Sequence, residues 1–260
     1  MLYDAVPVSE IVDSPCAQEF LREATRLASS EELAGIGLAL DEKSRKLRQT
    51  LAPEALSAAG AEELASVLAR IFFLRRKARR FVEARGLERL REAIARLLHS
   101  DAPVEDRLES FVEGVGGLRE PLLVALATEL LHFTTPESFA LWTPWIWDRS
   151  NGAGALPLVL EAGQLETTGS LGRDYREVDL ATLALTEAGQ RHGFARVAHG
   201  PFATDVFLAC VYGVYMRTVV TMRLSKEMND VLPELGEMAQ RILGVHPRAG
   251  AAQKERVSHV

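Results

Sequence analysis

The three tryptophans of this chain lie within six positions, as Trp142, Trp145 and Trp147. His132 lies upstream of this tryptophan block, and Asp148 follows it directly. Aromatic rings provide large apolar contact surfaces, and a histidine beside a carboxylate can transfer a proton or hold a polar ligand. The block therefore has two interpretations: a core plug that docks a loop, or the wall of a ligand pocket with His132 and Asp148 at its rim. Because aromatic side chains dominate the packing of cores, the core plug is favoured.

A second candidate site is in the apolar segment Val206–Met216, eleven uncharged residues between Asp205 and Arg217. A membrane-spanning helix needs about 20 apolar residues, so this segment predicts a buried helix and no membrane span. Tyr212 needs a hydrogen-bond partner if it is buried, and Arg217 needs a counter-ion. A substrate site that uses Tyr212 and Arg217 is one interpretation, and a structural pairing is the favoured one.

A third candidate site is cationic. Residues 43–96 contain 14 basic and six acidic residues, a net charge of +8, whereas the whole chain has a net charge of -6. At helical spacing, part of this segment presents an arginine face with an aromatic residue at its border, which is a candidate surface for phosphates or an acidic partner. A solvated face is the favoured alternative. The candidate partner-binding residues are Phe73, Arg75, Arg76, Arg79 and Arg80.

No motif in the sequence specifies a reaction. No two histidines lie at ligand spacing on one predicted helix, and there is no Cys-x-x-Cys pattern, so no metal site is predicted. The chain also lacks a Gly-rich cofactor loop that follows a strand, so no cofactor is predicted. Cys16 and Cys210 are too few for a disulfide framework. The catalytic residues, if there are any, are unknown, and whether the protein is an enzyme is left open.

The sequence signals for helices are strong and those for strands are weak, so helices are expected to position these candidate residues. Apolar residues at spacings of three and four predict one long amphipathic helix over residues 64–82, ended by Gly86. The mostly apolar stretch 118–132 predicts a central helix. Val206–Met216, apolar on all sides, is expected to be the most buried segment of the chain.

The region around the tryptophans has mixed signals. Thr135-Pro136-Glu137 is typical of a helix start, and Pro144 predicts a break near Thr143. Several glycines then predict a long Gly-rich loop near 149–178. Helix is expected to resume at Asp179.

Together these signals predict one mainly α-helical, bundle-like domain over residues 1–247, followed by a flexible C-terminal tail at 248–260. The first residues include an acidic residue and no basic region, which is unlike a signal peptide. The sequence therefore favours a soluble, cytoplasmic protein.

For function, the favoured hypothesis is a non-catalytic accessory protein that binds a protein partner or forms a homo-oligomer. Two alternatives remain open. One is an enzyme or small-ligand binder with an aromatic pocket around Trp142–Trp147. The other is a protein that binds nucleic acid or an acidic partner through the basic helices of residues 43–96.

Overall fold

The computed structural model describes residues 11–193, 198, 200–223 and 232–247. Within these residues the chain forms eleven α-helices, two short 3-10 helices and no strand, which confirms the predicted mainly α-helical single domain. The predicted tail at 248–260 lies outside the described residues. The elements are α2 (Ser14–Leu27), α3 (Ser30–Leu51), α4 (Pro53–Ala58), α5 (Ala61–Leu68), η1 (Phe72–Leu74), α6 (Ala78–Arg85), α7 (Leu87–His99), α8 (Val104–Val115), α9 (Glu120–Thr134), η2 (Leu156–Val159), α10 (Leu171–His192), α11 (Ala203–Arg223) and α12 (Leu235–Ile242).

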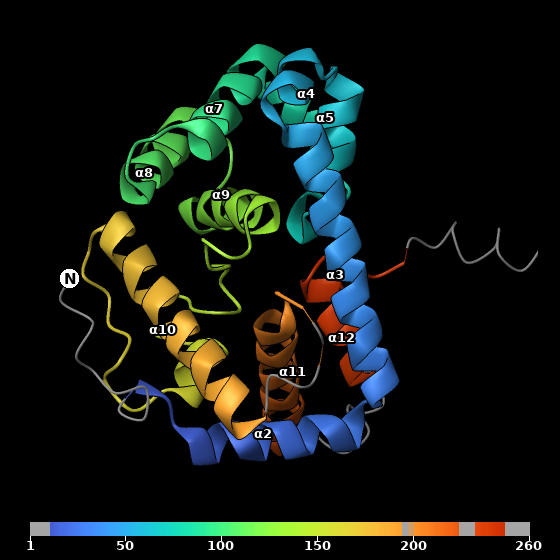
Figure 1. Cartoon of the computed structure of the whole chain (residues 1–260), viewed down its shortest axis with the longest axis vertical. Helices are drawn as coiled ribbons and strands as arrows, with labels where there is room; N and C mark the ends of the chain where they lie inside the picture. The colour runs from blue at the N-terminus through green and yellow to red at the C-terminus, as the bar shows by residue number, and fades with distance from the viewer. Residues whose placement is uncertain (1–10, 194–197, 199, 224–231, 248–260) are drawn as a thin grey trace, which may run out of the picture.

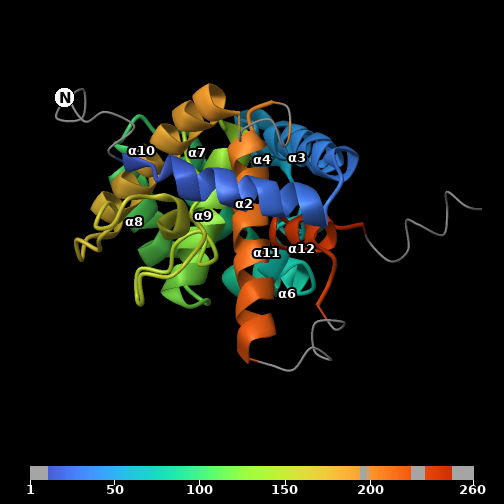
Figure 2. The same cartoon turned by 90° about the horizontal axis from the view of Figure 1, so that it is seen from below.

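Two helices occupy the middle of the molecule. Figure 1 shows α9 and α11 enclosed by α2, α3, α7, α8 and α10. Helix α9 packs against α3, α7 and α8, whereas α11 packs against α2, α10, α12 and α3. The long helix α3 therefore contacts both central helices, and Figure 2 shows α2 crossing α11 from outside.

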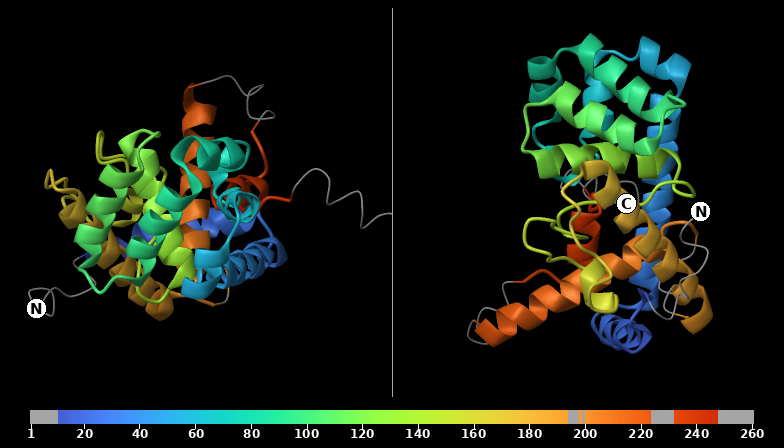
Figure 3. Two further views of the ribbon diagram at one scale, coloured as in Figure 1. Left: turned by 90° about the horizontal axis from the view of Figure 1, so that it is seen from above. Right: turned by 90° about the vertical axis from the view of Figure 1, so that its left-hand side faces the viewer.

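Helix α9 is the most enclosed element. Its eleven residues from Leu123 to Phe133 are all buried, as expected for a helix that is apolar on nearly every side. The prediction that Val206–Met216 is the most buried segment is wrong. Tyr215 is 37% exposed and Tyr212 is only partly buried, because the C-terminal part of α11 extends beyond the other helices (Figure 3).

Helix α11 is also longer than its central uncharged run. The window Ala203–Val220 has a mean hydropathy of 1.3, which by length and composition suffices to cross a membrane. In this structure 56% of that window is buried against other helices, and the core helix of a globular domain has the same composition. That the chain has no membrane span therefore stays a prediction.

Gly213 sets the distance between α11 and α12. A Cβ at this position would overlap the Leu235 side chain of α12. We therefore expect Gly213→Leu to lower the free energy of unfolding by about 1–3 kcal/mol through overpacking. Chemical denaturation measures the effect, and the control is Gly35→Leu on α3, where no atom lies within 4 Å of an added Cβ. Equal stability of the two variants would contradict close packing of α11 on α12.

The predicted long helix over residues 64–82 is wrong. The chain forms α5, then η1, and resumes as α6 at Ala78. Ile71 adopts an extended conformation (φ -84°, ψ 125°), which ends the α-helical hydrogen bonding. Ile71 and Leu74 are both buried at the turn. The apolar spacing therefore continues across the break, because residues three apart share a face in a 3-10 turn as they nearly do in an α-helix.

The boundaries of the predicted loop also change. No helix begins at Thr135, and residues 135–170 form one long connection that contains only η2. Helix α10 begins at Leu171, eight residues before the predicted start at Asp179. Ser170 caps it, and the buried carboxylate of Asp174 accepts hydrogen bonds from the backbone and side chain of Thr168. The Gly-rich region that was predicted to be a loop therefore includes the first turn of α10, and its glycines are divided between the loop and that turn.

Candidate functional site

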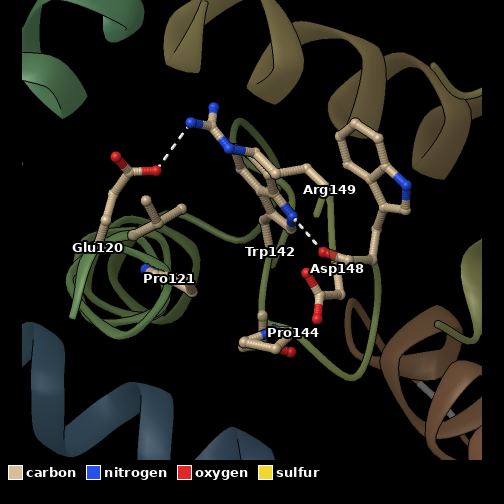
Figure 4. A pocket seen from close by; sticks show the side chains of 9 residues that line it. Glu120, Pro121, Trp142, Pro144, Asp148 and Arg149 are labelled. Atoms are coloured by element: carbon tan, nitrogen blue, oxygen red, sulfur yellow. Dashed lines mark hydrogen bonds and ion pairs between the residues drawn. The ribbon is translucent and has the colours of Figure 1, made fainter. Parts of the chain in front are cut away.

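The tryptophan block is mostly core. Trp142 is 4% exposed and Trp147 is 2% exposed, whereas Trp145 is half-buried. The Trp142 ring stacks against those of Trp147 and Tyr175, with centroid distances of 5.7 Å and 6.4 Å. Its indole Nε1 donates a hydrogen bond of 2.9 Å to the Trp147 carbonyl (Figure 4). Two ring contacts and one hydrogen bond thus hold the Trp142 side chain in place.

The loop that holds these rings is tied to α9 and α10. The Thr128 hydroxyl of α9 donates to the Trp142 carbonyl at 2.7 Å. Residues 148 and 153 form an isolated antiparallel bridge, and the backbone N–H of Ala155 donates to the Trp145 carbonyl. On α10, Tyr175 donates its hydroxyl to the Ala140 carbonyl at 3.2 Å, and Asp179 accepts from the Ala140 N–H at 2.9 Å. Hydrogen bonds to α9 and α10 therefore position the block without a helix of its own.

A small cavity lies beside two of the tryptophans. Its volume of about 20 Å³ has room for about one water molecule, and it is lined by Trp142, Trp147 and Asp148, with Arg149 and Glu120 among the other lining residues (Figure 4). The Arg149 guanidinium pairs with Glu120 at 2.8 Å and with Asp174 at 3.0 Å. The charged groups at the rim are thus already bonded to the protein.

Two polar atoms at this cavity are buried without a partner among the described residues. They are the Thr143 hydroxyl oxygen and the Trp147 indole nitrogen. The Asp148 carboxylate accepts bonds from Ser150 and Asn151. The arrangement favours the packing interpretation of the tryptophan block, and the two unpaired atoms are the features that a small polar ligand would use.

The remaining candidate ligand residues lie elsewhere. The Trp145 ring packs against Tyr212 of α11, with centroids 6.1 Å apart. Arg217, further along α11, donates to the Pro233 carbonyl at 2.9 Å. His132 lies in the core and does not line the cavity. The structure thus brings Trp142, Trp147 and Asp148 together and separates them from His132, Tyr212 and Arg217.

His132 is part of a buried ion pair that joins α9 to α11. It is 4% exposed, and its Nε2 lies 3.1 Å from Asp205 Oδ2. Its Nδ1 lies 2.7 Å from the Phe139 carbonyl oxygen. Both neighbours are acceptors, and only the doubly protonated imidazolium donates from both ring nitrogens. Burial alone lowers the pKa of His132, but the Asp205 carboxylate and the Phe139 carbonyl raise that pKa above its ordinary value.

A second buried ion pair joins α3 to α9, and sequence reasoning missed it. Lys43 Nζ lies 2.8 Å from Glu129 Oε2, and the two side chains are 1% and 5% exposed. The ammonium also donates to the Leu243 carbonyl at 2.9 Å and lies 3.9 Å from the centre of the Phe133 ring. Burial lowers the pKa of Lys43 and raises that of Glu129, while their mutual attraction opposes both shifts.

A signal for Lys43 exists in the sequence. The buried side of α3 follows helical spacing, and both Lys43 and Ser44 fall on it together with Leu40 and Leu47. A lysine on an apolar face predicts a buried charge with a carboxylate partner. Glu129, within the apolar stretch of α9, is the corresponding signal on the other helix.

The raised pKa of His132 makes stability depend on pH. The folded protein retains the proton at pH values where the unfolded chain, with a pKa near 6.5, has lost it. The stabilisation is complete below that value and is lost as pH rises through the folded pKa. We therefore expect the difference in free energy of unfolding between wild type and His132→Gln to shrink as pH rises above the unfolded-state pKa and through the raised folded-state pKa.

Urea denaturation at several pH values measures this difference, with His99→Gln as the control. His99 is an exposed residue that bonds only to the Leu51 carbonyl. A difference for His132→Gln that stays constant would show that the pKa of His132 is the same in the folded and unfolded chain, and a difference that grows with pH would show that His132 is neutral in the folded protein; either result contradicts the prediction.

An open groove lies between α5, the turn before α6 and the segment after α12. Two adjoining compartments of about 1000 Å³ and about 340 Å³ share Ala69, Arg75, His246 and Pro247 in their linings. Figure 2 shows α6 and α12 next to each other on this side of the molecule. We call it the basic groove, because its lining includes Arg70, Arg75, Arg76, Lys77, Arg79 and Arg241.

The charge of the basic groove contrasts with that of the chain. Besides Lys43, which is 1% exposed and paired with Glu129, six arginines and lysines line the groove, together with two carboxylates, Glu42 and Glu62, whereas the chain has a net charge of -6. Arg79 pairs with Glu62 at 3.1 Å and with Glu83 at 3.0 Å, Arg241 pairs with Glu237 at 2.5 Å, and Glu42 pairs with Lys46 at 2.7 Å. Cationic side chains concentrated in a concave surface raise the local concentration of anions.

Four of the five predicted partner-binding residues line this groove: Phe73, Arg75, Arg76 and Arg79. The expectation that the arginines share one helix face is wrong, because Arg75 and Arg76 lie in the turn before α6. Arg80 is exposed on α6 outside the lining. Sequence reasoning missed Arg241 and His246, which come from the far end of the chain and meet the turn only through folding.

No known family, curated protein or solved structure matches this chain. Within the described residues, no group of three or more histidine, cysteine or acidic side chains is arranged to hold a metal ion. The functional assignment therefore depends on the geometry of the basic groove, the tryptophan cavity and the two buried ion pairs.

Proposed function

We propose that the protein is a non-catalytic accessory protein that binds a polyanionic partner macromolecule in the basic groove. The observation that carries the proposal is that six cationic side chains, besides the buried Lys43, and only two carboxylates line one open groove of an acidic chain. Such a groove attracts phosphates or clustered carboxylates, and long-range attraction speeds their association.

The buried titratable groups support binding over catalysis. Lys43 is bonded to Glu129, and His132 is bonded to Asp205, with all four side chains almost fully buried. These groups hold α3, α9 and α11 together and do not open into the tryptophan cavity. The groups that face open space in the basic groove are mainly guanidinium and ammonium groups, which bind anions in their ordinary charge state.

Charge reversal in the groove tests the proposal. Arg76 and Lys77 are exposed and form no ion pair with a described residue, so Arg76→Glu/Lys77→Glu changes the groove without breaking a pair. We expect the wild-type chain to bind labelled polyglutamate or oligothymidylate more weakly as salt increases. The double variant should bind at least about tenfold more weakly, because like charges then face the ligand. Fluorescence anisotropy measures the affinities.

The matched control is Arg48→Glu/Arg96→Glu. It produces the same change in net charge at exposed positions of α3 and α7, outside the groove lining. Exposed charges contribute little to stability, so both variants should melt like the wild type. The proposal fails if the wild type binds neither polyanion, or if the control weakens binding as much as the groove variant.

A further inference from the structure

We propose that the polyanion held by the basic groove is a single-stranded nucleic acid, an inference that rests on the proposed function. The observation that points to this ligand is an exposed aromatic ring among the cations. Phe72 is 49% exposed and lines the same compartment as Arg75, Arg76 and Lys77. Grooves that bind single strands combine cations that follow the backbone with aromatic rings on which bases stack.

The turn itself holds Phe72 outward. Ile71 and Leu74, directly before and at the end of this 3-10 turn, are both buried. Their burial fixes the turn against the core and leaves Phe72 on the open side. Phe73, half-buried beside it, also lines the groove and adds apolar surface under the same compartment.

The cations nearest to this ring are open to a ligand. Arg76 and Lys77 follow Phe72 within five positions and are exposed. Arg75 is held in place by a bond of 3.2 Å from its guanidinium to the Pro247 carbonyl. A phosphate at the Arg76–Lys77 pair therefore lies close enough along the turn for a base of the same strand to reach Phe72.

The Phe72 ring favours a polyanion that has free base faces over one that has charges alone. An acidic protein segment gains from the six cations, but its carboxylates have no stacking surface for Phe72. The bases of a duplex are already stacked in its interior, which leaves only its backbone for the groove. A single strand has both a charged backbone and free base faces, so it uses the cations and the ring together.

The experiment compares four labelled ligands on the full chain by fluorescence anisotropy. They are an oligothymidylate of about 12 nucleotides, an abasic phosphodiester of the same length, a duplex of that length and polyglutamate. We expect the oligothymidylate to bind about tenfold or more tightly than the abasic strand, since stacking on one aromatic ring contributes about that much. Phe72→Ala should lower the oligothymidylate affinity about tenfold and leave the abasic affinity unchanged.

The control variant is Leu38→Ala, which removes an exposed apolar side chain, 71% exposed, on α3 outside the groove. It should change neither affinity. Equal binding of the abasic strand, the duplex or polyglutamate, together with no effect of Phe72→Ala, overturns the single-strand assignment and leaves the polyanion-binding proposal standing. Absence of binding to all four ligands overturns both.

Discussion

Glu129→Ala should lower the free energy of unfolding by about 3–5 kcal/mol. The substitution leaves the Lys43 ammonium 1% exposed with no carboxylate at 2.8 Å, and an unpaired buried charge is among the most destabilising changes in a core. The neighbouring bonds to the Leu243 carbonyl and the Phe133 ring offset only part of this cost. Urea denaturation at neutral pH measures the loss.

Two further variants isolate the buried charge. Glu42→Ala breaks the Lys46–Glu42 pair, in which both side chains are about half exposed, 43% and 52%, and it should cost less than about 1 kcal/mol. Lys43→Met/Glu129→Leu removes both charges and should recover most of the stability lost in Glu129→Ala. A small loss in Glu129→Ala, similar to that of Glu42→Ala, would mean that Lys43 reaches water in the folded protein.

Gly154→Ala is the second change with a large expected effect, about 2–5 kcal/mol of lost stability. Gly154 has φ +147°, a conformation that side chains rarely adopt, and an added Cβ would overlap the backbone of Ile146 and Trp147. Backbone atoms cannot rotate away as a flexible side chain does, so the whole tryptophan loop must shift. Thermal denaturation measures the loss, and tryptophan fluorescence reports the movement of the rings.

Gly152→Ala is the matched control two residues earlier. Gly152 also has a positive φ of +71°, but no atom lies near its missing Cβ. It should therefore cost only about 1–2 kcal/mol, the strain of a left-handed conformation. If the two variants lose equal stability, the close approach at Gly154 does not hold the loop.

The sequence by itself determined the helical class and much of the helix positioning. Ser29 and Glu32 form the capping box that starts α3, and Pro15 and Pro121 lie in the first turns of α2 and α9. These signals are local, because a cap or a first-turn proline acts on groups within one helical turn. The mostly apolar composition of residues 118–132 also predicted a central helix, which α9 confirms.

Only the tertiary structure decided which of these elements meet. Lys43 and Glu129 are 86 residues apart and His132 and Asp205 are 73 apart, so no local pattern pairs them. The break between α5 and α6 was hidden because burial at Ile71 and Leu74 keeps helical spacing across the turn. Because the helix breaks at this turn, Phe72 and the cations of the turn line the same groove as Arg241 and His246. Electrostatic attraction and burial depend on the distances between groups in space, and residues far apart in the sequence reach those distances only when the helices pack together.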